Sequence, residues 1–212
     1  KGLDFSVCYP EPAFDGRMVM YDLNYFKYCF LKATGLEFSE SLLQDDFEKL
    51  REDLTEDCGE TFMYRDFQAR NVMLKDDQPY FIDFQGGRKG PIYYDVASFI
   101  WQARARYPED LKNELVQTYL RALKSFVEVD EEKFYEKLRL FVLFRTLQVL
   151  GAYGFRGYFE KKPHFLESVP FALSSLRKLL QKPFDAYPYL SGLLIKLANM
   201  PELNNVATDT RL

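Results

Sequence analysis

Apolar residues recur every three or four positions over most of this chain, which is the spacing of one face of an α-helix. The first such segment begins near Asp22 and has the apolar positions Leu23, Phe26, Phe30 and Leu31. Gly35 is placed to end this helix in a left-handed conformation. Either Ser39 or Ser41 can cap the start of a second helix. The apolar positions of that second helix are Leu42, Leu43, Phe47, Leu50 and Leu54.

Three short segments in the middle of the chain have a pattern typical of strands. Residues 61–64 are short, apolar and rich in β-favouring side chains. Residues 72–74 and 80–82 are two further apolar runs, and the turn-forming sequence Asp-Asp-Gln-Pro at 76–79 lies between them. These patterns predict a β-hairpin and a small β-ribbon.

The remaining pattern is helical again, after a glycine-rich stretch at 86–91. It predicts helices near residues 94–106, 108–126, 131–152, 164–181 and 187–199. Residues 1–20 contain Pro10, Pro12 and Gly16 and predict an irregular or extended entry segment. We therefore expect a mainly α fold with one small β-ribbon. The expected division is an entry segment at 1–21, a domain at 22–200 and a polar tail at 201–212.

Composition and charge narrow the class of protein. Hydrophobic residues make up 47% and charged residues 28% of the 212 positions, which is typical of a globular protein. The net charge is −4 and the chain has no long Lys/Arg cluster, so nucleic acid is not expected as a partner. No membrane span is expected either, because Arg145 interrupts the longest apolar run at 141–155. Three widely spaced cysteines, Cys8, Cys29 and Cys58, fit neither a disulfide framework nor a zinc site and favour a cytoplasmic protein.

Three polar residues around the predicted hairpin carry candidate chemistry. Asp66 and Asn71 are five positions apart, and Asp83 follows twelve positions after Asn71. Phosphoryl transfer from a nucleotide needs a carboxylate that orients a hydroxyl and accepts its proton, and it needs an amide and a second carboxylate that hold Mg²⁺. Asp and Asn are also common in turns, where they bind nearby backbone amides. The complete arrangement of strand, Arg-Asp, Asn, hairpin and Asp-Phe favours the catalytic interpretation.

The stretch from Tyr64 to Ser98 resembles the catalytic and metal-binding loops of the aminoglycoside phosphotransferase and choline kinase superfamily, which shares the protein-kinase fold. The resemblance implies ATP and Mg²⁺ as cofactors and Asp66 as the catalytic carboxylate. It implies Asn71 and Asp83 as the Mg²⁺ ligands that also hold the nucleotide. Gln85 follows the metal-binding Asp83 and is a candidate contact to the metal's water shell or to the substrate.

Four further positions are assigned through the same resemblance. Gln68 stands where protein kinases often have Lys and is expected to face the nucleotide. Arg70 is then the nearest cation for the transferred phosphoryl group, although a surface or intraloop ion pair explains it equally well. Tyr64 replaces the usual His that braces the metal-binding loop, and its hydroxyl can make a similar bond. Asp95 is expected to hold the catalytic loop from below, at the positive end of its own helix.

Comparison with two groups of kinases narrows the class of acceptor that this chain is expected to phosphorylate. Protein kinases carry an Ala-Pro-Glu anchor after the metal Asp; this chain has none, so protein substrates are disfavoured. The segments at 83–95 and 145–153 are similar to those of bacterial kinases that phosphorylate cell-wall amino sugars at the anomeric hydroxyl. That similarity makes four polar residues candidate acceptor contacts, with the polar positions of a core helix as the alternative. They are Arg145, Gln148, Tyr153 and Arg156.

The recognised motifs all belong to the C-terminal lobe of the kinase fold. No strand-rich segment and no glycine-rich phosphate loop precede residue 22, so we expect this chain to lack the N-terminal lobe. Residues 61–98 would be its catalytic and metal loops, and 99–200 a helical substrate subdomain. Alone it is expected to turn over ATP weakly or not at all. Two alternatives stay open: a kinase for choline, a homoserine-like alcohol or an aminoglycoside, and a regulatory pseudokinase that only binds a partner.

Overall fold

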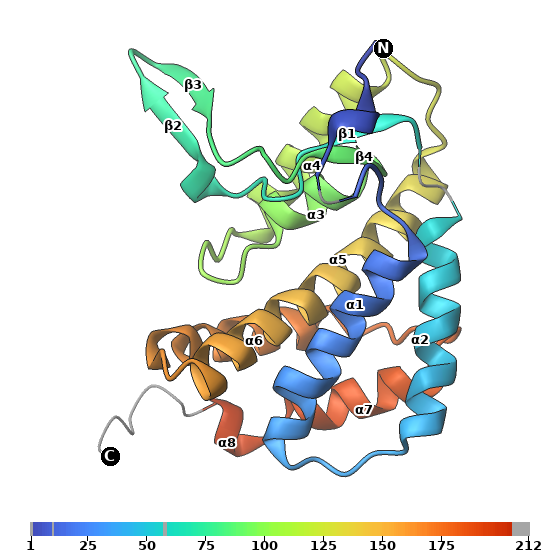
Figure 1. Ribbon diagram of the computed structural model, residues 1–212, viewed down its shortest axis with the longest axis vertical. Coiled ribbons are helices and arrows are strands. Elements are labelled where there is room, and N and C mark those ends of the chain that lie inside the picture. The colour runs from blue at the N-terminus through green and yellow to red at the C-terminus, as the bar shows by residue number, and fades with distance from the viewer. Residues whose placement is uncertain (1, 10, 57–58, 205–212) are drawn as a thin grey trace. The chain divides into compact units, whose positions relative to one another are not determined.

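The computed structural model describes residues 2–9, 11–56 and 59–204 (Figure 1). It is mainly helical, as expected from the sequence, and it has two small antiparallel sheets where one β-ribbon was expected. The chain separates into two compact units, each described by itself. One comprises Lys1–Asp15 and Thr55–Val142, and the other comprises Gly16–Leu54 and Leu143–Leu212.

The second unit begins with the predicted first helix, which starts earlier than expected. Helix α1 (Gly16–Phe26) continues as a π-helix, η2 (Lys27–Leu31), and a 3₁₀ turn, η3 (Lys32–Thr34). Gly35 ends it with a φ of 74°, as predicted. The prediction of irregular structure up to residue 20 was wrong, because Met18 and Val19 extend the buried apolar stripe towards the N-terminus. The predicted boundary at residues 21–22 consequently lies inside α1.

Helix α2 (Glu40–Thr55) follows a cap formed by Ser39. The Ser39 Oγ accepts the backbone N–H of Leu42 at 3.4 Å, and its carbonyl accepts that of Leu43 at 3.1 Å. Ser39 is therefore the N-cap, and Ser41 lies within the first turn. Four of the five predicted apolar positions are buried, whereas Leu42 is 49% exposed because it falls outside the buried stripe.

The rest of this unit is helical. The second half of α5 (Glu131–Gly154) leads into a π-helix, η5 (Phe155–Phe159), and a 3₁₀ segment, η6 (Pro163–Ser168). Helix α6 (Val169–Leu179) packs against α7 (Pro188–Ala198) and α8 (Pro201–Asn204). The predicted polar tail thus begins as a helix, since Leu203 is buried. Residues 205–212 of the tail lie outside the described residues.

Among the residues that the structure describes, one helix qualifies as a membrane span by length and composition, contrary to the sequence-based expectation. It is the continuous helix Glu131–Phe159, with 29 residues and a mean hydropathy of 1.2 in its most apolar window. Arg145 does not interrupt it, because the charged side chain is itself buried and donates a hydrogen bond to Gln148. Within the protein, 67% of the window is buried, and the core helix of a globular protein passes the same test.

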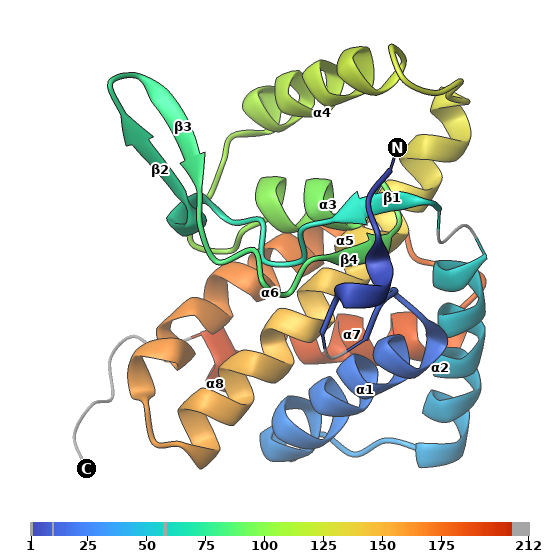
Figure 2. The same ribbon diagram turned by 45° about the horizontal axis from the view of Figure 1, so that its top comes forward.

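The first unit contains the paired strands, helices α3 and α4, and the first half of α5 (Figure 2). Strand β1 (Thr61–Met63) pairs antiparallel with β4 (Arg88–Gly90), with Thr61 opposite Gly90. The sequence predicted no strand in the glycine-rich stretch. Gly90 permits one because a Cβ there would lie 2.8 Å from the Met63 side chain. Helix α3 (Tyr94–Ile100) ends six residues before its predicted end, and α4 (Glu109–Leu123) follows.

The N-terminal segment of this unit is mostly extended. It has one 3₁₀ turn, η1 (Phe5–Val7), whose start Asp4 caps. Further along, the backbone N–H of Phe14 donates to the carbonyl of Lys89 in β4 at 2.8 Å. The entry segment is thereby attached to the edge of the small sheet.

The predicted hairpin is formed by β2 (Val72–Lys75) and β3 (Gln78–Phe81). Its turn has two residues instead of the four predicted, because Asp76 and Asp77 both adopt positive φ, of 50° and 57°. That conformation is the type I′ turn, whose twist matches the flanking strands. The hairpin projects from the rest of the unit in both views, and most of its side chains are exposed (Figures 1 and 2).

Candidate functional site

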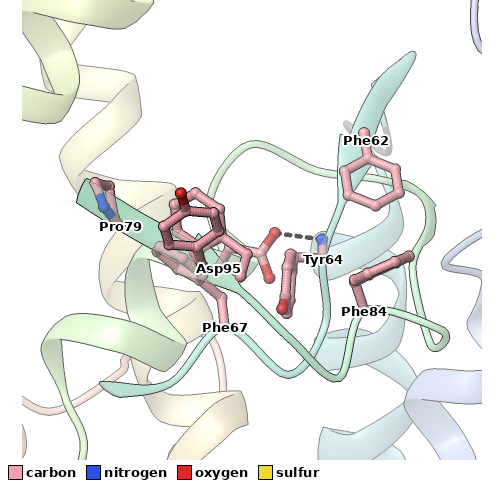
Figure 3. Close-up of a pocket in the computed structure, with 8 residues that line it drawn as sticks. Phe62, Tyr64, Phe67, Pro79, Phe84 and Asp95 are labelled. Carbon is pink, nitrogen blue, oxygen red and sulfur yellow. Dashed lines mark hydrogen bonds between the residues drawn. The ribbon is translucent and has the colours of Figure 1, made fainter. Parts of the chain in front are cut away.

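The catalytic loop predicted around Asp66 is held from α3 by one carboxylate. Asp95 accepts the backbone N–H of Tyr64 at 2.6 Å with Oδ2 and that of Arg65 at 2.9 Å with Oδ1 (Figure 3 shows the bond to Tyr64). Arg65 has a φ of 76°, which a residue with a Cβ adopts only at a cost. The two hydrogen bonds from Asp95 therefore stabilise a strained backbone directly before Asp66, as the resemblance implies for this Asp.

Aromatic contacts fix the same loop one residue after Asp66. The ring of Phe67 stacks on that of Phe99 in α3, with centroids 4.9 Å apart, and lies 6.0 Å from that of Phe81 in β3. A further contact comes from Gln102, whose Oε1 accepts the backbone N–H of Ala69 at 3.1 Å. The role of Gln102 was not predicted from the sequence, because nothing in its spacing from Ala69 indicates this hydrogen bond.

The two predicted metal ligands are brought together. Asn71 is buried, and its Nδ2 donates to the backbone carbonyl of Asp66 at 2.8 Å and to Oδ2 of Asp83 at 3.3 Å. Asp83 adopts a φ of 67°, a second strained position in the same small region. Gln85 Nε2 donates to the other oxygen of Asp83 at 2.8 Å. Asp66, Asn71, Asp83 and Gln85 thus form one connected group.

The hydroxyl of Tyr64 links the catalytic loop to the metal-binding loop. It donates a hydrogen bond to the carbonyl of Ile82, the residue before Asp83. Burial raises the pKa of this hydroxyl, and the negative charges of Asp83, Asp66 and Asp95 raise the pKa further. Three carboxylates consequently lie within electrostatic range of one phenol. Tyr64 makes the kind of brace expected of the His that it replaces.

The donor set matches what Mg²⁺ requires. Amide and carboxylate oxygens are the hard ligands that this ion prefers. Within residues 2–9, 11–56 and 59–204, no cluster of three or more His, Cys, Asp or Glu side chains is arranged for a metal. Mg²⁺ is commonly bound by one or two carboxylates together with water and substrate phosphates, so the predicted pair of Asn71 and Asp83 would suffice as its protein ligands.

Gln68 and Arg70 lie in the turn between Asp66 and Asn71. Gln68 has extended backbone with φ −136° and precedes a one-turn 3₁₀ helix, η4 (Ala69–Asn71). Its carbonyl accepts the backbone N–H of Asn71 at 2.9 Å. Arg70 lies in that turn with its side chain exposed to solvent. Neither position contradicts its expected role towards the nucleotide phosphates.

The four predicted acceptor contacts belong to the other unit, on α5 and η5. Arg145 is buried and donates to Gln148, whose Nε2 donates to Oδ2 of Asp22 at 2.5 Å. Tyr153 is half-buried. Arg156 is exposed and pairs with Glu160 at 2.8 Å. Asp22 was missed because 126 positions separate it from Gln148 in the sequence.

A largely apolar cavity of about 580 Å³ lies against the catalytic loop. Its lining residues are Phe62, Tyr64, Phe67, Pro79, Tyr80, Phe81, Phe84 and Asp95. In the close-up, Phe62 and Phe84 stand to one side of Tyr64, and Phe67 and Pro79 stand to the other (Figure 3). Phe84, which directly follows the predicted metal ligand Asp83, is 61% exposed. The metal-binding loop therefore borders an exposed aromatic surface.

Several characterised bacterial proteins are similar in sequence to this chain. An N-acetylmuramate/N-acetylglucosamine kinase of Neisseria meningitidis is 28% identical over 199 residues, which cover 91% of this chain and 59% of the kinase. A kinase of the same name from Pseudomonas aeruginosa is 28% identical over 66% of this chain and 41% of its own length. A third, from Pseudomonas putida, is 22% identical over 76% of this chain and 49% of its own length. The chain thus spans 41–59% of the length of these relatives.

A family model also matches the chain directly. The model describes a phosphotransferase enzyme family and covers residues 28–136, just over half of the 212 positions. The match includes the residues predicted to form the catalytic loop and the metal site, and also Asp95. The chain therefore belongs to this phosphotransferase enzyme family.

Proposed function

We propose that this chain is the C-terminal lobe of an ATP-dependent kinase that transfers the γ-phosphoryl group to a hydroxyl of an amino sugar. The observation that carries the proposal is that the Asn71 carboxamide binds both the Asp66 backbone carbonyl and the Asp83 carboxylate, which joins the three residue types that phosphoryl transfer needs. The names of the relatives support the amino-sugar acceptor.

In the proposed mechanism, Asp66 orients the acceptor hydroxyl and accepts its proton late in the transfer. Asn71 and Asp83 hold Mg²⁺, which offsets the negative charge of the nucleotide phosphates when bound. Gln85 fixes the free oxygen of Asp83 through its 2.8 Å hydrogen bond. Arg70 faces the transferred group, and Gln68 lines the nucleotide side of the turn. Positioning and electrostatics supply most of the rate, because the transition state of phosphoryl transfer is loose.

The division of labour along the chain follows from the same proposal. Residues 61–98 carry the catalytic and metal-binding loops, and residues 99–200 form the acceptor-binding helical part. Arg145, Gln148, Tyr153 and Arg156 are the proposed acceptor contacts. The complete enzyme requires an N-terminal lobe over the nucleotide, so the 212 residues alone would have little or no activity. The exposed aromatic surface beside Asp83 supports this need for a covering partner.

The test is phosphoryl transfer by the full-length gene product with Mg·ATP and four acceptors: N-acetylglucosamine, N-acetylmuramate, choline and an aminoglycoside. Asp66→Asn is expected to lower kcat by about 10²–10⁴-fold, the usual contribution of a positioned general base. Asp77→Asn makes the same chemical change in the exposed hairpin turn and is expected to leave kcat unchanged.

The outcomes are distinct. A sugar 1-phosphate formed by the wild type and not by Asp66→Asn supports both the acceptor and the role of Asp66. Turnover of choline or an aminoglycoside instead would refute the amino-sugar acceptor but support the kinase reaction. Tight binding of Mg·ATP without transfer to any of the four would refute the kinase proposal in favour of a regulatory binding protein.

A further inference from the structure

Gln102 lies just after α3 and uses both ends of its side-chain amide. Its Oε1 accepts the backbone N–H of Ala69 at 3.1 Å, and its Nε2 donates to the carbonyl of Phe99 at 2.7 Å. The second bond fixes the orientation of the carboxamide, so that the oxygen points at the catalytic loop. Ala69 is the first residue of the 3₁₀ turn η4, where a backbone N–H has no partner within the turn itself.

Three residues of this segment contact the catalytic loop in succession. Asp95 and Phe99 are four positions apart on one face of α3, and Gln102 follows two residues after the end of that helix. Asp95 binds the backbone at Tyr64 and Arg65, whereas Phe99 stacks on the ring of Phe67. Gln102 holds the third point, at Ala69. These three contacts fix the loop before, next to and after Asp66.

The contact between Gln102 and Ala69 also restrains Asn71, the proposed metal ligand, because both Ala69 and Asn71 belong to the turn η4. Ala69, Arg70 and Asn71 form the single turn η4, and the Asn71 carboxamide binds both the Asp66 carbonyl and Asp83. A rotation of this turn would therefore move the Asn71 carboxamide relative to Asp66 and Asp83. The N–H of Ala69 is the point at which α3 and the residues after it restrain that rotation.

We infer that Gln102 is a positioning residue for phosphoryl transfer, which acts by fixing the turn that carries Asn71 next to Asp66. The inference rests on the proposed function. Gln102 binds the backbone N–H of Ala69, so its effect on Asp66 and Asp83 would pass through the Ala69 backbone. Its loss would disturb the geometry of the metal site while leaving most of the nucleotide contacts in place.

Three variants separate the hydrogen bond from other effects of the side chain. Gln102→Met keeps the length of the side chain and removes its amide. Gln102→Glu keeps an oxygen acceptor for Ala69 and loses the donor to Phe99. Ala69→Pro leaves Gln102 intact and removes the backbone N–H; Gln68 has φ −136° and ψ 155°, which the residue before a proline readily adopts. Gln117→Met is the matched control, since it removes a side-chain hydrogen bond, to Tyr135, outside the loop.

The variants are made in the full-length protein and tested with Mg·ATP and the acceptor that the wild type uses. Gln102→Met and Ala69→Pro are each expected to lower kcat by about 5- to 100-fold with little change in the KM for ATP. Both should raise the Mg²⁺ concentration that gives half-maximal rate. Gln102→Glu should retain more activity than Gln102→Met. The double variant should be no slower than either single variant, because both remove the same bond.

A second readout, amide hydrogen exchange at Ala69, does not depend on turnover. Faster exchange in Gln102→Met than in the Gln117→Met control is expected, and equal exchange would overturn the inference even if one variant folds poorly. If the wild type is active and kcat of both Gln102→Met and Ala69→Pro stays within twofold of the wild-type value, the positioning role is refuted and the proposed function is not. Absence of any phosphoryl transfer by the wild type would instead refute the proposed function, and the positioning role with it.

Discussion

The anchor of the catalytic loop gives a quantitative prediction for Asp95→Asn. The carboxylate accepts two backbone N–H groups, at 2.6 and 2.9 Å, and sits in the first turn of α3. Asparagine has nearly the same shape but keeps one acceptor oxygen and turns an NH₂ group towards the other N–H. The half-buried backbone of Tyr64 and Arg65 would then lose one bond, and the remaining bond would no longer be charge-assisted.

The magnitude follows from these two bonds. A hydrogen bond to a charged acceptor contributes about 1.5–3 kcal/mol, and a neutral one about 0.5–1.5 kcal/mol. Replacing two charged bonds by one neutral bond should therefore lower the free energy of unfolding by about 3 kcal/mol. For a chain of this size, that corresponds to a decrease in Tm of roughly 6–12 °C. The positive φ of Arg65 adds to the effect, because the strained conformation loses its restraint.

The assay is thermal unfolding followed by circular dichroism, without nucleotide, so that it does not depend on the proposed activity. Asp110→Asn is the matched control, because Asp110 also lies in the first turn of a helix, α4, and its loss removes a similar interaction with the helix dipole. The difference between the two variants removes the contribution of the helix dipole from the effect of Asp95→Asn. A Tm of Asp95→Asn within about 2 °C of Asp110→Asn would refute the reasoning.

Two further predictions concern pH and packing. Burial raises the pKa of Tyr119 from 10.0 to about 12, so between these values the unfolded chain loses a proton that the folded chain keeps, and stability falls as pH rises. Urea unfolding at pH 10–11.5 should show a smaller alkaline loss in Tyr119→Phe; an equal loss would contradict the assignment. Gly154→Ala places a Cβ 2.2 Å from the carbonyl oxygen of Cys29 and should destabilise by about 1–3 kcal/mol or more. Gly192→Ala meets no atom within 4 Å and should stabilise α7 by up to about 1 kcal/mol, and the opposite order in urea would refute this packing.

Local sequence predicted the residues of the candidate site better than it predicted the residues that hold them in place. Asp66, Asn71 and Asp83 stand close together in the sequence, and a short hairpin suffices to bring the Asn71 carboxamide to both the Asp66 backbone and the Asp83 carboxylate. Asp95 was predicted through a family resemblance, and the structure shows its two hydrogen bonds. Gln102 was not predicted, because its partner is a backbone N–H 33 positions away. Neither the residue type at position 69 nor the spacing between the two positions indicates such a bond.

The errors in secondary structure have common physical causes. Helix α1 starts earlier than predicted because burial of Met18 outweighs the nearby breaking signals. Strand β4 was missed because its residues gain strand structure only by pairing with β1, and Gly90 is needed there to avoid Met63. The turn of the hairpin is shorter than predicted because two consecutive Asp residues accept positive φ. In each case a contact or a backbone conformation outweighed the local preference.

The sequence by itself determined the mainly helical class, the positions of most helices, and the group of residues suited to phosphoryl transfer. Helical periodicity and the short spacing of the motif are local properties, so they can be read without the fold. Only the tertiary structure decided which backbone groups Asp95, Gln102 and Tyr64 bind to hold that motif in place. The bonds from Asp95 and Gln102 to the loop backbone, and the brace from Tyr64 to Ile82, join residues 18–33 positions apart. Such contacts depend on how α3 and the strands pack, because a backbone N–H or carbonyl is the same at every residue and no sequence pattern marks its partner.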